Sequence, residues 1–236
     1  MTTTEGSAGL GPGASAALGR MLAKEDRVSD LLALLAAVDP VPLTGALGLQ
    51  MYEPEAAREV MLRFADKGGE AGRADLLVRG KGRPAALLEI KVAAAQHGDQ
   101  FERYDRWARE QDPQVRCFLV GLVEETDAAP DGWRTDLTLP TLLRAWQRSQ
   151  DPHAAWLAGA AAGVLAGWVR ELDEPIGTAT AAAVADLVSR RVATDLLGDE
   201  GLRAADLHTG TGRTSGGTAS VVAWLPVPGL PAAAGA

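Results

Sequence analysis

The chain has 236 residues, of which 47% are hydrophobic and 23% charged, and it contains a single cysteine. This predicts one large globular domain, or a domain with an appended subdomain, and excludes a disulfide framework or a cysteine-based zinc site. The formal net charge of −8 argues mildly against nucleic acid as a partner. The charge is uneven, however, because residues 58–116 hold 12 basic and 10 acidic side chains, whereas the rest holds 11 and 21. A local surface compatible with phosphate is therefore not excluded.

The N-terminal segment 1–19 is rich in Gly, Ser, Thr and Ala, and it lacks the basic start and compact apolar run of a secretory signal. We expect this lead to be disordered, and we expect the same of the tail, residues 227–236. With no signal visible, the expected location is cytoplasmic.

Residues 21–38 carry apolar side chains at helical spacing and predict one helix that ends at Asp39-Pro40. Glu25 falls on the same face of this helix as Met21 and Val28. A carboxylate is therefore expected on a core-facing stripe, although a glutamate at the flank of the helix is an equally good interpretation.

Two apolar runs, residues 74–79 and 84–92, predict the strands of a β-hairpin. The segment Gly80-Lys81-Gly82, which lies between them, is typical of a three-residue turn with glycine in the left-handed position. Alternation along the second run gives one wholly apolar face that is directed to the core: Ala86, Leu88, Ile90 and Val92.

Glu89 and Lys91 interrupt this second run on its other face. Burying charged groups costs more than it returns unless they are paired or bind a metal. With the three-residue turn, Asp75 lies opposite Leu87 and on the same face as Glu89. Two carboxylates and an ammonium are thus expected in one patch. The alternative interpretation is an amphipathic strand whose solvent face carries an ion pair.

The order of the elements predicts an α/β core over residues 20–150 and a helical C-terminal extension with a final strand over residues 151–226. Its Gly159, Gly163 and Gly167 recur every fourth residue, which suits the close approach of another helix, in the core or in a homodimer. The apolar stretch around them is too short for a membrane span. Before the hairpin, residues 43–55 show no clear pattern, residues 58–65 fit a strand but also a helix, and residues 68–73 fit a turn. After the hairpin, the sequence predicts a helix at 99–111, a strand at 115–123 and a helix from about Pro140. The extension is expected to contain helices at 153–171 and 178–197, a loop at 208–218 and a strand at 219–227.

Two carboxylates on rigid strands suit Mg²⁺, which binds few carboxylates and takes its other ligands from water and substrate phosphate. Asp75 and Glu89 are the candidate ligands, and the carbonyl of Ile90 between the motif side chains is an extra one. Glu25 would complete the shell directly or through water. Lys91 would hold the attacking water or the scissile phosphate as a point charge.

These residues resemble the PD-(D/E)XK nuclease superfamily. The motif residues are Asp75 in GRADLLV and Glu89-Ile90-Lys91 in LLEIKV. Gln100 and Tyr104 match the Gln-x-x-x-Tyr pattern that some branches carry on the next helix, and Glu25 corresponds to the early-helix glutamate. Ala74 stands where many members have proline.

The resemblance implies a restriction-endonuclease-like core, a central mixed sheet flanked by helices. It also implies hydrolysis of phosphodiester bonds in DNA with Mg²⁺, or Mn²⁺ in its place, in phage defence or DNA repair. Gln100 and Tyr104 would contact the site or its substrate. The alternative is a catalytically inactive nuclease-like protein that acts as a nucleic-acid- or protein-binding module.

Overall fold

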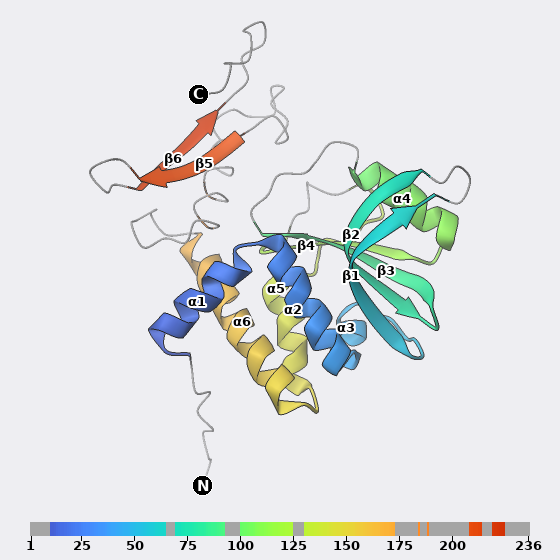
Figure 1. The fold of residues 1–236 in the computed structure, drawn as a ribbon, viewed down its shortest axis with the longest axis horizontal. Coiled ribbons are helices and arrows are strands. Elements are labelled where there is room, and N and C mark those ends of the chain that lie inside the picture. The colour runs from blue at the N-terminus through green and yellow to red at the C-terminus, as the bar shows by residue number, and fades with distance from the viewer. Residues whose placement is uncertain are drawn as a thin grey trace, which may run out of the picture.

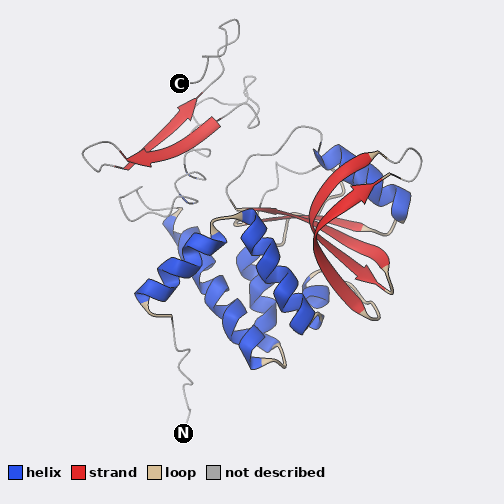
Figure 2. Cartoon of the chain, viewed as in Figure 1, coloured by secondary structure: helices blue, strands red, loops and turns tan. Residues whose placement is uncertain are grey.

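The computed structural model describes residues 10–64, 69–92, 100–124, 130–172, 184, 188, 208–213 and 219–224. It has an α/β architecture in which a four-stranded mixed sheet is flanked by helices (Figures 1 and 2), which confirms the expected fold class at this level. The main elements are α1 (Pro12–Leu22), α2 (Glu25–Val38), α3 (Val41–Ala46), β1 (Pro54–Arg63), β2 (Glu70–Gly80), β3 (Arg83–Lys91), α4 (Gln100–Gln111), β4 (Arg116–Gly121), α5 (Leu139–Arg144), the 3₁₀ turn η1 (Ala145–Arg148) and α6 (Pro152–Glu171), followed by β5 (His208–Arg213) and β6 (Ala219–Trp224).

The sheet has the strand order β1-β2-β3-β4. Strand β2 is antiparallel to both β1 and β3, whereas β3 and β4 are parallel and are connected through α4. A parallel pair needs such a crossover, because the chain must return to the end of the sheet where β3 began. Strands β5 and β6 form a separate antiparallel pair.

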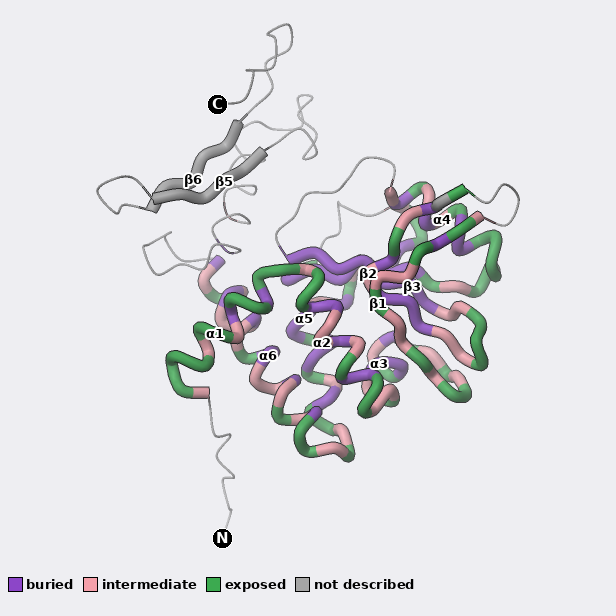
Figure 3. The backbone as a smooth tube through the Cα atoms, in the orientation of Figure 1, coloured by how far each residue is buried: buried purple, intermediate pink, exposed green. Residues whose placement is uncertain are grey.

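Both faces of the sheet are covered, so that β3 is buried along most of its length (Figure 3). On one face, Leu88 and Ile90 belong to a core cluster that also contains Leu32 of α2 and Leu165 of α6. On the other face, Leu87 packs in a second cluster with residues of α4. This confirms the predicted apolar face of β3. Because α6 shares the first core, the predicted boundary at residue 150 does not separate two cores.

The hairpin between β2 and β3 differs from the prediction in its register. The turn has two residues, Lys81 and Gly82, with φ angles of 48° and 76°. An irregularity between Val78 and Arg79 shifts the register beyond it, so that Leu76 pairs with Leu88. A two-residue turn alone would direct the Asp75 side chain away from that of Glu89, since a shift of one residue reverses the face. The irregularity restores the common face.

The predicted helix 21–38 is wrong as a single element. The chain leaves α1 at Leu22, Lys24 has an extended backbone with φ of −119° and ψ of 126°, and α2 begins at Glu25. Met21, expected on the apolar face, is 56% exposed. Leu22 and Val28 are both buried, so that the apolar spacing continues across the junction and conceals it. The disordered lead is also wrong for its second part, because α1 begins at Pro12.

Three further predictions need correction or completion. The unassigned residues 43–55 contain the end of α3 and the start of β1. Residues 70–73, expected in a turn, belong to β2, where the pairing to β1 continues to Glu70. Residues 208–213, expected in a loop, form β5 because they pair with β6 despite their glycines. The predicted helix at 178–197 lies largely outside the described residues.

The glycine stripe of α6 does not receive a neighbouring helix within the described part of the chain. A Cβ atom added at Gly163 would have no atom within 4 Å, and one at Gly159 would meet only the side chain of Gln147. Helices α1 and α6 approach each other closely at Gly19 of α1, where an added Cβ atom would lie 3.5 Å from the Trp168 side chain of α6. A homodimer through the stripe stays a prediction. Among the described helices, none is long and apolar enough to cross a bilayer.

Candidate functional site

The candidate site lies where β2 and β3 separate. The backbone pairing of these strands ends at Leu76 and Leu88, and the same register extended by one residue places Asp75 opposite Glu89. Beyond this point the Asp75 side chain replaces a backbone carbonyl of β2 as the hydrogen-bond acceptor, because its Oδ2 accepts a hydrogen bond from the Ile90 amide at 2.7 Å. The amide and carbonyl of one strand residue point to the same side. The carbonyl of Ile90 is therefore also directed to the side of Asp75.

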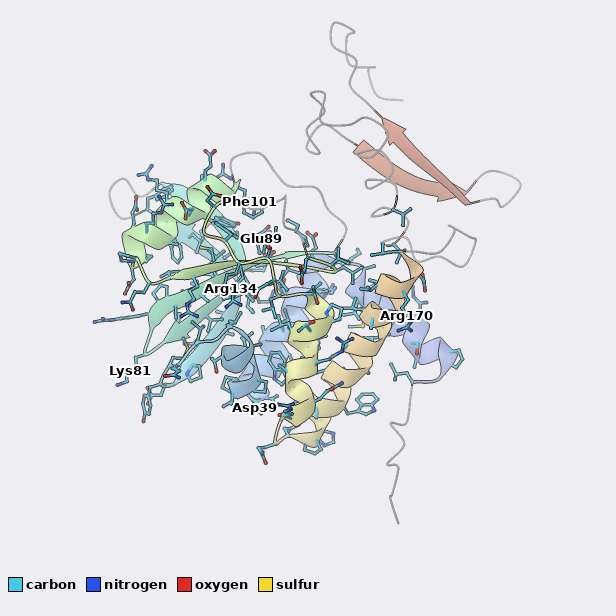
Figure 4. All side chains as sticks on the ribbon, turned by 180° about the vertical axis from the view of Figure 1, so that it is seen from behind. Asp39, Lys81, Glu89, Phe101, Arg134 and Arg170 are labelled. Carbon is cyan, nitrogen blue, oxygen red and sulfur yellow. The ribbon has the colours of Figure 1, made fainter. Side chains whose placement is uncertain are left out.

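Glu89 is the most deeply buried charged group of the site, with 2% of its surface exposed. Its Oε1 accepts hydrogen bonds from Lys91 Nζ at 2.8 Å and from Gln100 Nε2 at 2.9 Å. Its Oε2 is buried and has no hydrogen-bond partner in the described structure. An unpartnered buried carboxylate oxygen is costly, and a bound cation would satisfy it. Figure 4 shows Glu89 near the end of the sheet that is distant from Lys81 in the turn.

Glu25 reaches the same point from α2. Its Oε1 accepts a hydrogen bond from the amide of Val92 at 3.1 Å, and its Oε2 lies 3.7 Å from Lys91 Nζ. Lys91 therefore stands between two carboxylates, those of Glu89 and Glu25. These contacts make Glu25 a partner of Lys91 and of the end of β3, while its role as a metal ligand stays a prediction.

Gln100 and Tyr104 join the site to α4 and β2. The Gln100 amide donates to Glu89 Oε1 and also to the Tyr104 hydroxyl, at 2.8 Å. That hydroxyl in turn donates to the carbonyl of Arg73 at 2.5 Å. Burial and the nearby Glu89 carboxylate raise the pKa of Tyr104 to about 12, so that the phenol stays protonated at neutral pH. Its role in the free protein is to hold Gln100, and through it Glu89.

The electrostatics of the site favour a bound cation. Burial, followed by repulsion from Glu89, raises the pKa of Asp75 from 3.8 to about 7. Burial also raises the pKa of Glu89 above its ordinary value. Burial lowers the pKa of Lys91, but attraction to Glu89 and Glu25 outweighs it, so that the pKa is raised overall and the ammonium is kept. One ammonium faces three carboxylates, and added positive charge would favour the ionised form of each.

The donor set fits a hard cation held by few protein ligands. Glu89 Oε2 is unpartnered, Asp75 uses Oδ2 for Ile90, and the Ile90 carbonyl lies on the same side. Mg²⁺ suits this set, because it binds through one or two carboxylates and keeps several waters. Within the residues that the structure describes, no group of three or more His, Cys, Asp or Glu side chains is arranged to hold a metal. A metal here would therefore depend on two carboxylates and on oxygens from outside the protein side chains.

Gly72 is a site residue that the sequence did not reveal. Its φ is 129°, and a Cβ atom built on it would lie 2.7 Å from Cε1 of the Tyr104 ring. The close approach of Tyr104 to β2, and hence its bond to Arg73, needs a residue without a side chain. In the sequence this glycine stands in the segment GGEAGR, which is typical of a turn.

We expect Gly72→Ala to lower the free energy of unfolding by about 2–4 kcal/mol, since it combines an unfavourable φ with a steric clash. Urea unfolding followed by circular dichroism measures this. The matched control is Gly163→Ala, on the exposed side of α6, which should raise stability by about 0.5–1 kcal/mol through helix propensity. Equal effects of the two substitutions would contradict the role of Gly72.

Comparison with known proteins returned no match: no protein-family model, no curated protein and no solved structure is significantly similar to the chain.

Proposed function

We propose that this protein is a Mg²⁺-dependent nuclease with a restriction-endonuclease-like core that hydrolyses phosphodiester bonds in DNA. The observation that carries the proposal is the buried Glu89, whose Oε1 is held by Lys91 and Gln100 while its Oε2 has no partner in the described structure. Asp75 shares this end of the sheet. If the strand carried only a structural ion pair, a buried carboxylate oxygen without a partner would lower stability and gain nothing in return.

Each residue has a separate task in this proposal. Mg²⁺ bound by Asp75, Glu89 and the Ile90 carbonyl would neutralise charge on the scissile phosphate and acidify a water molecule. Lys91 provides a fixed positive charge for the phosphate or for the attacking water. Its ammonium is oriented by Glu89 and by Glu25, so that Glu25 acts as a positioning residue.

Gln100 and Tyr104 fix the orientation of the metal-binding carboxylate. Because Gln100 donates to Oε1 of Glu89, the second oxygen stays available. Tyr104 holds Gln100 in this position and is itself fixed by the carbonyl of Arg73. DNA as the substrate, and phage defence or DNA repair in the cytoplasm as the setting, belong to the same proposal and rest on the motif.

The test is cleavage of single- and double-stranded DNA, with RNA alongside, in Mg²⁺ or Mn²⁺ and in EDTA. We expect cleavage that EDTA abolishes and that Lys91→Ala lowers about 10²–10³-fold, the usual effect of removing one group that stabilises developing charge. Lys81→Ala, in the exposed hairpin turn, is the matched control and should retain full activity. If the wild type is inert on every substrate, or Lys91→Ala cleaves equally well, the proposal fails. Binding of labelled DNA would then test a non-catalytic module.

A further inference from the structure

A second cleft lies at the other end of the sheet, where β3 and β4 begin. Its volume is about 890 Å³, within the range of small-molecule sites. It is lined by residues 48–51 before β1, by the start of β3 at Arg83, by residues 112–117 at the start of β4, and by Gly132 and Arg134. Ala85 in this cleft and Glu89 in the candidate site are four residues apart on β3, about 13 Å along the strand. The cleft is therefore distinct from the candidate site.

Arg116 is held in this cleft by neutral partners. Its Nη1 donates to the carbonyls of Leu47 and Gly48, at 3.4 and 3.0 Å. Within the described part of the chain no carboxylate forms an ion pair with it. Backbone carbonyls orient a guanidinium without neutralising its charge. The remaining N–H groups of Arg116 are available to a bound anion, which arginine favours in bidentate geometry.

Arg134 lies beside Arg116. The position that a Cβ atom on Gly48 would take lies 3.4 Å from Arg116 Nη1 and 3.9 Å from Arg134 Nη1, so that both guanidinium groups approach one point. Gly48 has a φ of 65°, which favours glycine at this position. Because glycine has no side chain, the point between the two guanidinium groups stays open. Arg134 is fixed by two bonds to Asp136, at 3.0 and 2.7 Å, and its guanidinium lies 5.2 Å from the ring centre of Phe118.

The remaining lining supplies a further charge and an apolar wall. Arg83 is exposed at the start of β3 and forms no ion pair with any described residue. The acidic member of the lining is Asp112, whose Oδ1 accepts a hydrogen bond from the amide of Gln114. Three arginines therefore face one aspartate in the cleft, with Asp136 paired to Arg134 beside it. The apolar part of the lining includes Leu49, Met51, Pro84 and Val115.

We propose that this cleft binds a phosphate-bearing ligand of mononucleotide size, with the phosphate between Arg116 and Arg134 and the organic part against the apolar wall. Asp136 offsets the charge of Arg134 but makes no ion pair with Arg116, so that an anion between the two guanidinium groups would still reduce their mutual repulsion. The size of the cleft exceeds what inorganic phosphate alone would fill. This site does not depend on the proposed nuclease activity.

The test is calorimetric titration of the full chain in EDTA with AMP, adenosine and inorganic phosphate. We expect AMP to bind, adenosine to bind at least tenfold more weakly, and inorganic phosphate to compete with AMP. Arg116→Gln should weaken AMP binding at least tenfold, and Arg83→Gln, on an exposed side chain, should weaken it without an effect on folding. Arg20→Gln, on the exposed side of α1, is the matched control and should bind normally.

Lys91→Ala separates the two sites, because a ligand in the second cleft should bind this variant as tightly as the wild type. Loss of AMP binding in Lys91→Ala would assign the ligand to the candidate site and overturn the proposal. Absence of AMP binding to the wild type, or binding unchanged in both Arg116→Gln and Arg83→Gln, would also overturn it. None of these results depends on whether the protein cleaves DNA.

Discussion

Replacing Glu89 with glutamine is expected to lower the rate of Mg²⁺-dependent DNA cleavage by about 10²–10³-fold. Glutamine has nearly the same shape and can still accept from Lys91 and Gln100, so that the fold should be kept. It has no negative charge, and it presents an amide group where Glu89 has its unpartnered oxygen. A hard cation needs the anionic oxygen. The affinity for the metal should therefore fall together with the rate.

Two measurements together identify the cause of this loss. Calorimetric titration with Mn²⁺ should show weaker binding to Glu89→Gln, and circular dichroism should show an unchanged fold. Glu55→Gln is the matched control, because Glu55 is exposed on β1 and should leave both rate and metal binding unchanged. Retention of wild-type cleavage by Glu89→Gln would exclude Glu89 as a metal ligand.

Asp75→Asn is expected to stabilise the metal-free protein at pH 8 while it abolishes stabilisation by Mg²⁺. The pKa of Asp75 is raised from 3.8 to about 7 in the folded protein, mainly by burial and then by Glu89. Between these pH values the folded state binds more protons than the unfolded state, so that stability falls as the pH rises. The whole loss amounts to about 4 kcal/mol, and it is complete only above the folded pKa. Asparagine removes it and can still accept from the Ile90 amide.

The measurement is the free energy of urea unfolding at pH 5 and pH 8, in EDTA and in Mg²⁺. The gain from Asp75→Asn in EDTA should be larger at pH 8 than at pH 5. In Mg²⁺ at pH 8, the wild type should gain stability and the variant should not, because ligand binding to the folded state stabilises it. Asp131→Asn, at an exposed position, is the matched control. A gain that is the same at both pH values would show that the ionisation of Asp75 is not its cause.

The common face of Asp75 and Glu89 was predicted from the sequence, but through two errors that cancel. The prediction used a three-residue turn with no irregularity, whereas the chain has the two-residue turn Lys81-Gly82 and a shift at Val78 and Arg79. Each of these two differences moves the register of β2 against β3 by one position. The first would turn the Asp75 side chain to the opposite face of the sheet, and the second returns it to the face of Glu89. Turn residues such as glycine can be recognised in a sequence. A β-bulge depends on pairing with strands on both sides and leaves no comparable local signal.

Other features depend on contacts between distant parts of the chain. Periodicity describes one segment at a time, so the apolar spacing of residues 21–38 did not reveal the change of direction at Lys24. The need for glycine at Gly72 arises from the ring of Tyr104, which follows more than thirty residues later. The second cleft combines loops around Gly48, Arg83 and Arg116 that only the folded sheet brings together. In contrast, Glu89 and Lys91 were identifiable because charge in an apolar run is unusual in any fold. Gln100 was identifiable only through the Gln-x-x-x-Tyr pattern of the resemblance.

The hydrogen bond from Val92 to Glu25 has a consequence for how the protein acquires its site during synthesis. It joins residues 67 positions apart, and closing so long a loop costs conformational entropy that only the packed core can offset. Strand β3 also becomes a central strand only after β4, which ends at Gly121, has paired with it. A nascent chain therefore lacks the complete arrangement around Lys91 until the end of β3 and the whole of β4 have left the ribosome and packed into the sheet. The proposed hydrolytic activity would therefore require the finished fold.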